Sequence, residues 1–384
     1  MQARKVGIVD FARSPIARAK GGALNALAPL EIAGQVLRAL LARNPKVPPD
    51  RVEHLAVGCA FPEAEQGLNI ARQLVVKAGL PLSVAASTVN QFCASSQQST
   101  MMVADAIALG KGDIAISVGL EHMTRVPMGG YNPAFDAELY AQGFFTGMGE
   151  TAETLAREGE IPREAQEAFA AESHRRALRA WADGAFAREV VPIELPDGGQ
   201  VERDEGPQEP NLDKIRALKP AFDAGGTVTA ATSSPVTVGA AAMILMAEDT
   251  AELLGIPLRA TIVTTAVAGC DPVRMGMGPL PATAKALARA DLSIEHMDVI
   301  ELNEAFAAQS LFVIEKGGWE KKRDRINPLG GAIALGHPLG MSGVRIIGTC
   351  VTGLERLKGR YGLATMCVGG GQGAATIVER VGAK

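Results

Sequence analysis

The sequence predicts an α/β protein built from two similar halves, with an extra lobe inserted into the first half. Strand-like and helix-like segments alternate along the chain, which favours sheets with helices on both faces. One order of segments occurs twice, and residues 121–230 interrupt it. The chain has 384 residues, 47% of them hydrophobic. That is enough for a large core or for two similar cores packed together.

The repeated order is visible when the two halves are compared segment by segment. Apolar residues at helical spacing after Pro29 support a helix there, because proline is favoured in a first turn. The first half has a strand over 5–10, a helix from Pro29, a strand over 51–57, Val89-Asn90 before Cys93 and a helix, and a strand over 113–118. The second half has a strand over 260–265, a helix over 284–290, a strand over 295–302, Ile326-Asn327 before His337, a helix over 344–357, and a strand over 363–368.

Residues 121–230 break this rhythm. They contain a helical run over 163–181 and a polar stretch rich in proline and glycine over 196–220. They also keep several large apolar residues, which a linker would lack. We therefore expect an inserted lobe within a first domain over 1–250, followed by a second domain over 257–384.

Composition excludes several classes of protein. The net charge of -4 and the pI near 5.9 give no basic surface for nucleic acid. Five cysteines form no CxxC pair, so we expect neither a disulfide framework nor a structural zinc site. No apolar run is long enough to span a bilayer, and the N-terminal MQARKVGIVDF does not resemble a signal peptide. We expect a cytoplasmic protein of a reducing compartment.

Three residues carry the chemistry, each on a turn where an apolar strand gives way to glycine or small residues. They are Cys93 in TVNQFCASSQQST, His337 in GGAIALGHPLGMSG and Cys367 in ATMCVGGGQGAAT. Two thiols and an imidazole presented this way indicate covalent acyl chemistry, with one thiol as nucleophile. Because Cys93 opens a helix, we expect the helix dipole to lower its pKa. We expect His174, by contrast, on a solvated helix face.

With these motifs in view, the chain resembles the thiolase family over nearly its whole length. The resemblance rests on RSPIAR (13–18), TVTAATSSPVTVGAAAM (227–243), NEAFAAQ (303–309) and GGAIALGHPLG (330–340). EHMTRVPM (121–128) and GCDPVRMGMGP (269–279) look most like the bacterial degradative branch, the 3-ketoacyl-CoA thiolases of fatty-acid β-oxidation. The resemblance implies a five-layer αβαβα sandwich with a loop domain inserted in the first half.

The resemblance also implies roles for individual residues. Cys93 would be the nucleophile, His337 would take its proton, and Cys367 would be the second acid or base. One oxyanion site would use His337 with a water held by Asn303, and the other the main-chain N–H groups of Cys93 and Gly369. Coenzyme A would arrive as part of the substrate, with no metal or redox cofactor. The implied contacts to coenzyme A and the acyl end are Ser234, Phe222, Ala230, Met275 and Phe306.

The sequence departs from the family pattern without removing a reacting group. Gln91 stands in place of arginine, Ala94 in place of glycine, and Val238 where many members carry aspartate. Met341 replaces a residue that is often cysteine or alanine. These changes put the local hydrogen bonding and the seating of Cys93 in question.

The leading hypothesis is an acetyl-CoA C-acyltransferase that cleaves 3-ketoacyl-CoA with coenzyme A, or runs the reverse condensation. A biosynthetic acetoacetyl-CoA thiolase would use the same residues. Ketosynthases of polyketide type typically use two histidines with one cysteine, which the Cys-His-Cys set argues against. A non-catalytic CoA- or lipid-binding protein of the same fold is the alternative from another class. The resemblance implies a homodimer or homotetramer, and the short segment 121–150 favours the dimer. A hydratase–dehydrogenase partner is a further implied possibility.

Overall fold

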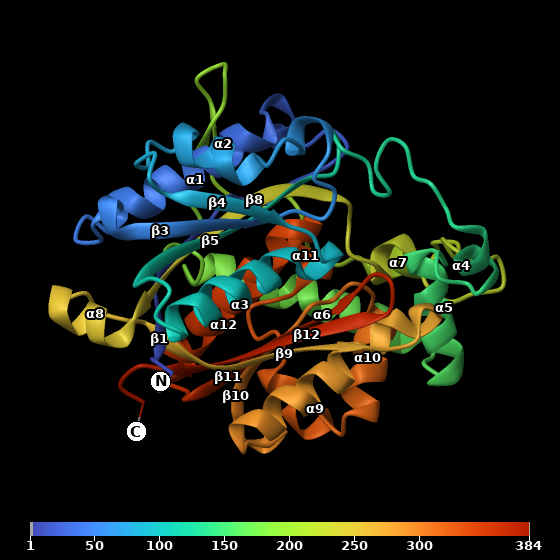
Figure 1. The fold of residues 1–384 in the computed structure, drawn as a ribbon. Coiled ribbons are helices and arrows are strands. Elements are labelled where there is room, and N and C mark those ends of the chain that lie inside the picture. Colours follow the sequence, from blue (N-terminus) through green and yellow to red (C-terminus); the bar gives the residue numbers. More distant parts are fainter. Residues whose placement is uncertain (1–2, 384) are drawn as a thin grey trace.

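The computed structural model describes residues 3–383, and these form five stacked layers (Figure 1). Helices α1 (Pro29–Arg43) and α2 (Ile70–Lys77) cover the outside of the first half. Helices α9 (Pro279–Ala290) and α10 (Ala307–Lys316) cover the outside of the second. Between the two layers of strands lie α3 (Ser95–Ala108) and α12 (Ser342–Leu357), which contact each other. The predicted α/β fold class is therefore confirmed.

The strands of both halves belong to one continuous hydrogen-bonded order, β10-β11-β12-β9-β1-β8-β5-β3-β4, with β2 paired to β8. Strand pairing between the halves is limited to a short antiparallel pairing of β1 with β9. Their bounds are β1 (Val6–Arg13), β2 (Ala17–Arg18), β3 (Val52–Gly58), β4 (Ala85–Val89), β5 (Ile114–His122), β8 (Thr237–Ala247), β9 (Ala260–Gly269), β10 (Met297–Leu302), β11 (Tyr361–Val368) and β12 (Gln372–Arg380).

The predicted repetition is present in the strand order. The first half reads β3-β5-β8-β1 and the second reads β10-β11-β12-β9. In each, the first pair is parallel and the next two pairs are antiparallel. In the first half, β4 pairs in parallel with β3. In the second half the equivalent pairing is reduced to a single parallel bridge between Ile300 of β10 and Ile326. Cys93 and His337 both follow this position, so the repetition places them at equivalent ends of the two halves.

Two central strands, β8 and β12, are absent from the strands predicted by the sequence. β8 contains the alanine-rich VGAAAMILMA and is buried along its full length. It lies between β1 and β5, with helices α1 and α12 in contact with it. A strand covered on both faces needs a continuous run of small and apolar residues rather than alternation. Tertiary position therefore decides its conformation.

Helices α3 and α12 approach closely because one glycine leaves room. A Cβ at Gly343 would lie 2.1 Å from the main-chain nitrogen of Gln97. Buried polar side chains of α3 form hydrogen bonds with the sheets on either side. Gln97 Nε2 donates to Ala364 O (3.0 Å) in β11, and Thr100 bonds Ser117 in β5 (2.8 Å). These contacts fix α3, and with it the turn that carries Cys93.

The segment between β5 and β8 forms the inserted lobe, whose helices lie on the side of the second half (Figure 1). Helix α5 contacts α10, and α6 contacts α11. Within residues 3–383, no helix combines enough length and apolar character to cross a bilayer. The lobe contains α4 (Ala137–Ala141), α5 (Met148–Glu158), α6 (Arg163–Ala182), β6 (Ile193–Glu194), β7 (Gln200–Val201) and α7 (Leu212–Arg216), and the remaining short helices are α8 (Glu248–Leu254) and α11 (Ala332–Leu335).

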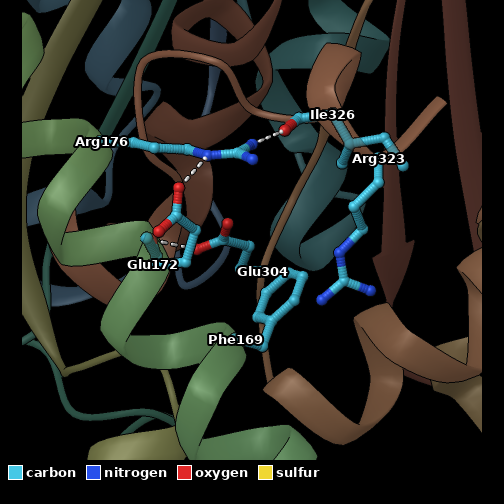
Figure 2. A pocket seen from close by; sticks show the side chains of 7 residues that line it. Phe169, Glu172, Arg176, Glu304, Arg323 and Ile326 are labelled. Carbon is cyan, nitrogen blue, oxygen red and sulfur yellow. Dashed lines mark hydrogen bonds and ion pairs between the residues drawn. The ribbon is translucent and has the colours of Figure 1, made fainter.

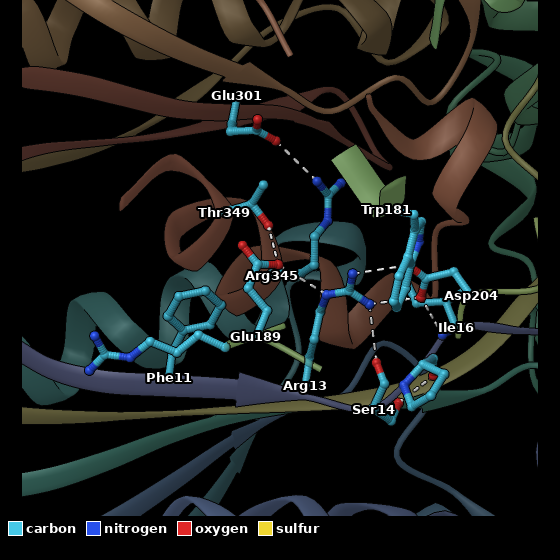
Figure 3. Close-up of polar contacts among 12 residues, drawn as sticks. Phe11, Arg13, Ser14, Ile16, Trp181, Glu189, Asp204, Glu301, Arg345 and Thr349 are labelled. Carbon is cyan, nitrogen blue, oxygen red and sulfur yellow. Dashed lines mark hydrogen bonds and ion pairs between the residues drawn. The ribbon is translucent and has the colours of Figure 1, made fainter. Parts of the chain in front are cut away.

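A buried charged network ties this lobe to the first half and to α12 (Figure 3). Arg13 on β1 donates to both oxygens of Asp204 (2.7 and 3.0 Å) and to Glu189 (3.2 Å). Glu189 also accepts from Thr349 of α12 (3.2 Å). The side chains of Arg13, Asp204 and Glu189 are buried, so each depends on its partners for the hydrogen bonds that water would otherwise supply.

Candidate active site

Cys93 lies in a strained turn between β4 and α3. The turn is a short 3-10 segment, Phe92–Ala94, and α3 begins directly after it. Phe92 has a φ of 43°, which is uncommon for a residue other than glycine. Local hydrogen bonds hold this conformation: Phe92 N donates to Asn90 Oδ1 (2.9 Å), and Ser95 Oγ accepts from Gln91 N (2.9 Å). The turn presents Cys93 at the start of the helix, as the sequence predicts.

The protonation state of Cys93 differs from the expectation. Burial raises the pKa of the Cys93 thiol to about 11, against an opposing effect of the N–H groups of Gly369 and Cys93 itself. The expected lowering by the helix dipole is therefore wrong, because removal of water outweighs the favourable N–H groups. In the resting protein Cys93 is a neutral thiol, partly exposed to the cavities that it lines.

His337 is held on three sides. Its main-chain N–H donates to Thr237 Oγ1 (2.9 Å). Asn303 Nδ2 lies 3.3 Å from His337 Nε2. Because an amide nitrogen only donates, Nε2 is the unprotonated ring nitrogen and Nδ1 carries the hydrogen. Nδ1 then donates to Ser342 Oγ (2.6 Å), which donates to Pro338 O (3.0 Å).

This arrangement keeps the imidazole neutral. Burial, reinforced by the nearby positive charge of Arg345, lowers the pKa of His337 to about 3. A neutral ring with an unprotonated Nε2 can accept a proton at any physiological pH. Ser342, which selects this tautomer, was not identified from the sequence. Its position five residues after His337, at the start of α12, is the signal that could have indicated it.

Cys367 lies near the end of β11 and is 1% exposed. Burial, with a smaller effect of Cys93, raises its pKa well above the ordinary value, so it is a protonated thiol. The chain then turns through Gly370 and Gly371, both with positive φ. A Cβ at Gly371 would lie 2.3 Å from Cys270 O, so this turn accepts only glycine without a shift.

Cys93, His337 and Cys367 line one cavity of about 460 Å³, which we call the central cavity. The structure therefore brings together the three residues that the sequence singled out. Asn303 is fully buried and reaches the cavity through its contact with His337. Four of the five residues expected near coenzyme A and the acyl end also line the central cavity: Phe222, Ser234, Met275 and Phe306.

The two other candidate residues lie in neighbouring cavities. Ala230 lines a cavity of about 480 Å³, the side cavity, together with Arg18, His174 and Lys214. Ser233 and Pro235 line both the side cavity and the central cavity. The residue His174 is 9% exposed, and burial lowers its pKa, so the expectation of a solvated position is wrong.

Gly369 lines a third cavity of about 460 Å³, the aromatic cavity, which also includes Cys93. Cys93 is therefore shared between the central and aromatic cavities, whereas Cys367 and His337 line the central cavity alone. The space around the nucleophile is divided into a side that holds the acid–base groups and a side that holds the glycine turn.

Two buried carboxylates near these loops were not identified from the sequence. Glu121, at the end of β5, accepts from Ala60 N (2.7 Å), Gly340 N (2.9 Å) and Gln66 Nε2 (2.8 Å). It thereby joins the loop after β3 to the loop after His337. Burial raises its pKa. Its position at the polar end of a fully buried, mostly apolar strand is the signal that could have indicated it.

Glu304, the second carboxylate, follows Asn303 directly. It accepts from Ser173 Oγ (2.7 Å), Asn327 Nδ2 (2.8 Å) and Ile333 N (3.2 Å). Figure 2 shows it beside α6, close to Arg176. These bonds connect α6, the loop after β10 and the loop before His337, and they position Asn303 against the imidazole.

The departures from the family pattern leave these contacts intact. Gln91 Nε2 donates to Gln372 Oε1 (3.2 Å), which joins the nucleophile turn to the start of β12. Ala94, Val238 and Met341 are fully buried. Val238 packs in the core of the first half, so an apolar residue suits this position in this chain.

A duplicated α/β fold with two thiols and a neutral imidazole around one cavity defines an enzyme of covalent acyl transfer. Comparison with known proteins agrees with this class. The N-terminal domain model of thiolases matches residues 6–249, and the C-terminal domain model matches residues 256–380. The chain belongs to the thiolase family.

Relatives and solved structures cover nearly the whole chain. The chain is 46% identical to a 3-ketoacyl-CoA thiolase of Vibrio parahaemolyticus, over 99% of each chain. It is 46% identical to a 3-ketoacyl-CoA thiolase of Vibrio cholerae, over 98% of this chain and 99% of the relative. Bacillus anthracis acetyl-CoA acetyltransferase superposes with a TM-score of 0.90 at 35% identity, covering 99% of this chain and 100% of the other. Human mitochondrial 3-ketoacyl-CoA thiolase gives 0.90 at 34% identity, covering 98% and 99%.

Proposed function

We propose that this protein is a 3-ketoacyl-CoA thiolase, an acetyl-CoA C-acyltransferase that cleaves 3-ketoacyl-CoA with coenzyme A. The observation that carries the proposal is that Cys93, His337 and Cys367 line one cavity. The 46% identity to relatives named 3-ketoacyl-CoA thiolase supports the degradative direction.

In the first half-reaction, Cys93 gives its proton to Nε2 of His337, and its sulfur attacks C3 of the substrate. The C2–C3 bond breaks and its electron pair remains on C2, as the enolate of acetyl-CoA. Cys367 donates its proton to C2, and acetyl-CoA leaves. The raised pKa of Cys367 supports this role, because the group must still hold its proton when the carbanion forms.

In the second half-reaction, the thiol of a new coenzyme A gives its proton to Cys367 and attacks the thioester on Cys93. The Cys93 thiolate leaves and recovers its proton from His337. The result is an acyl-CoA two carbons shorter, with every protein group returned to its starting state. The neutral resting forms of all three groups are the forms that this cycle requires.

Charge that develops on the substrate oxygens needs donors that are already in place. The N–H groups of Cys93 and Gly369 are directed at the Cys93 sulfur, where the tetrahedral carbon would form. His337 and Asn303 would serve the second oxygen, that of the enolate. Coenzyme A would extend from the central cavity past Ser234 and Phe222 towards the side cavity. There Arg18 and Lys214 would offer positive charge to its phosphates.

We also propose a cytoplasmic homodimer with domains over 1–250 and 257–384 and a lobe over about 121–230. Strand β4 lies at an edge of the sheet, which leaves main-chain groups for pairing with a second copy. Leu68 and Leu82, on either side of the preceding helix, are 93% and 70% exposed. Sedimentation in dilute buffer tests the dimer, and a monomer would contradict it. A hydratase–dehydrogenase partner remains an expectation by resemblance, to be tested by co-purification.

The test of the activity uses Cys93→Ala, with Cys270→Ala as the matched control because Cys270 lines none of the three cavities. Each protein is mixed with acetoacetyl-CoA, quenched in acid, and its intact mass is measured. The wild type and Cys270→Ala should carry an acetyl group, and Cys93→Ala should carry none and lose CoA-dependent cleavage. An unmodified wild type would overturn the proposal.

A further inference from the structure

Two buried charged side chains near His337 have no part in the reaction cycle described above. Arg345 on α12 and Glu301 on β10 are each 1% exposed, and Arg345 Nη1 donates to Glu301 Oε2 at 3.0 Å. Figure 3 shows this pair in the interior, beside the network of Arg13. Neither member lines the central, side or aromatic cavity. Because both groups lose their water, a buried ion pair is weak evidence for stability alone.

The pair joins the two elements that hold the imidazole of His337. Ser342, which accepts from Nδ1 at 2.6 Å, lies on α12 three residues before Arg345. Residues three apart on a helix share a face. Asn303, whose amide lies 3.3 Å from Nε2, follows β10 two residues after Glu301. The contact between Arg345 and Glu301 therefore fixes α12 against β10 beside both partners of the ring.

The charge of Arg345 also acts on the imidazole. After burial, it is the positive charge of Arg345 that lowers the pKa of His337. Arg345 bonds Glu301 through Nη1 only, and its Nη2 has no hydrogen-bond partner among residues 3–383. A neutral carboxyl group accepts a hydrogen bond but carries no opposite charge. The protonation of Glu301 therefore decides how far the charge of Arg345 is compensated.

Further buried charged or titratable groups surround the pair. They are Glu304 after β10, Glu189 before β6, Cys350 on α12 and Arg13 on β1. Glu189 accepts from Arg13 (3.2 Å) and from Thr349 (3.2 Å), so its charge is already paired. Burial raises the pKa of Glu301 to about 8, reinforced by Glu189 and Glu304 and opposed by Arg345. Glu301 is therefore neutral below pH 8 and ionised above it.

On the basis of the proposed function, we propose that Arg345 and Glu301 are positioning residues for His337. Together they hold the ring between its two partners and set how readily Nε2 accepts the proton of Cys93. When Glu301 is neutral, the charge of Arg345 opposes the imidazolium that forms. When Glu301 is ionised, its negative charge compensates Arg345 and the imidazolium is favoured. Proton transfer from Cys93 is therefore easier above pH 8 than below it.

The size of this effect follows from the single charge that appears on Glu301. At the effective dielectric constant of ~20 that applies within proteins, a unit charge ~10 Å away changes a proton affinity by about 16-fold. The rate of general-base catalysis follows proton affinity only in part, by about half on a logarithmic scale. The expected change in the rate of acylation is therefore about 4-fold. The KM should stay constant, because neither residue reaches a cavity.

The test compares the wild type with Glu301→Gln, whose amide imitates the protonated carboxyl group and stays neutral at every pH. The rate of acetyl-enzyme formation from acetoacetyl-CoA is measured between pH 6.5 and 9.5 by acid quench and intact mass. The two proteins should agree within about 2-fold at pH 6.5, and the ratio of wild-type to variant rate should rise about 4-fold, with a midpoint near pH 8. A purely structural role of Glu301 would lower the rate of the variant equally at every pH.

Glu153→Gln is the matched control. Glu153 is also 1% exposed, but it accepts from Thr227 N (3.0 Å) and Val228 N (2.8 Å) in the inserted lobe, so its ratio to the wild type should not vary with pH. Arg345→Lys keeps the charge without the planar fork and should retain the rise with pH at a lower rate.

The outcomes separate this inference from the proposed function. A ratio of wild-type to Glu301→Gln rate that does not change with pH, while the acetyl-enzyme forms normally, would overturn the positioning role and leave the activity standing. The same holds if Glu153→Gln shows an equal rise. Absence of acetyl-enzyme in the wild type at every pH would overturn both.

Discussion

Replacement of Asn303 distinguishes two roles that its position allows: orientation of the His337 imidazole and support of the enolate oxyanion. Its Nδ2 donates to Nε2 of His337 at 3.3 Å, on the nitrogen that would accept the Cys93 proton. Asn303 is fully buried, and its main-chain N–H is fixed by Thr365 O (3.0 Å). Asn303→Ala therefore removes the amide while the main chain keeps its anchor.

The expected loss depends on which role dominates. If the amide only orients the imidazole, one hydrogen bond of about 0.5–1.5 kcal/mol is lost, which is a factor of roughly 2–13. If it supports the oxyanion of the departing enolate, the loss in kcat is ~10²–10³. Because His337 keeps its bonds to Thr237 and Ser342, its orientation survives the substitution. We therefore expect the larger value.

The assay compares kcat for acetoacetyl-CoA thiolysis with the melting temperature of each protein. Asn327→Ala is the control, because Asn327 is also a buried asparagine of this region and bonds Leu302 and Glu304. It should lower the melting temperature more than Asn303→Ala and reduce kcat less. A kcat for Asn303→Ala within about 10-fold of the wild type would refute the oxyanion role and leave only orientation.

Three further predictions concern charge and burial. With a pKa of about 11 for Cys93, the thiolate fraction at pH 7.5 is ~3 × 10⁻⁴, so its alkylation by iodoacetamide should be ~300-fold slower than that of an ordinary cysteine of pKa ~8.5. Peptide mapping should show the rate rising about tenfold per pH unit up to pH 10, and a plateau below pH 8 would contradict the burial argument. Burial raises the pKa of Glu301 to about 8. The protonated carboxyl therefore favours the folded state, and this contribution to the free energy of unfolding is fully present below the unfolded-state pKa of Glu301. It is lost as the pH rises through 8. The melting temperature of the wild type should fall from pH 5 to 8, and that of Glu301→Gln should fall less steeply. An equal decrease of melting temperature with pH in both proteins would contradict this prediction. Arg13→Ala leaves Asp204 and Glu189 without their shared partner and should cost ~3–5 kcal/mol. The exposed Arg38, paired with Glu31 at 3.2 Å, is the control, and its replacement should cost ~0–1 kcal/mol; similar melting temperatures for the two variants would disprove the difference.

Most of the correct predictions rest on residues that are close together along the chain. Cys93, His337 and Cys367 each lie in a short turn whose flanking residues set its conformation. The glycines after Cys367 are an example, because the positive φ of Gly370 and Gly371 is a local requirement that the sequence displays directly. The repeated order of strands and helices is local in the same sense. The strands predicted over 5–10, 51–57, 113–118, 260–265, 295–302 and 363–368 each begin within two residues of the predicted position.

Elements whose conformation depends on their neighbours were predicted less well. The alanine-rich β8 has no alternation of its own and becomes a strand because it lies between β1 and β5. Ser342 and Glu121 act through contacts with the His337 loop. The contact of Glu121 with Gly340 joins residues 219 positions apart, and no local pattern predicts such a pair.

The sequence by itself indicated three candidate reacting residues and a structural plan that occurs twice, because short-range sterics and apolar spacing encode both the turns and the repeated elements. Only the tertiary structure decided the charge of those groups and the shape of the space around them. The pKa of a thiol depends on every atom that displaces water from it, and around Cys93 those atoms come from both halves. The aromatic cavity likewise combines segments near residues 61, 92, 135, 145 and 370, which are brought together only by packing.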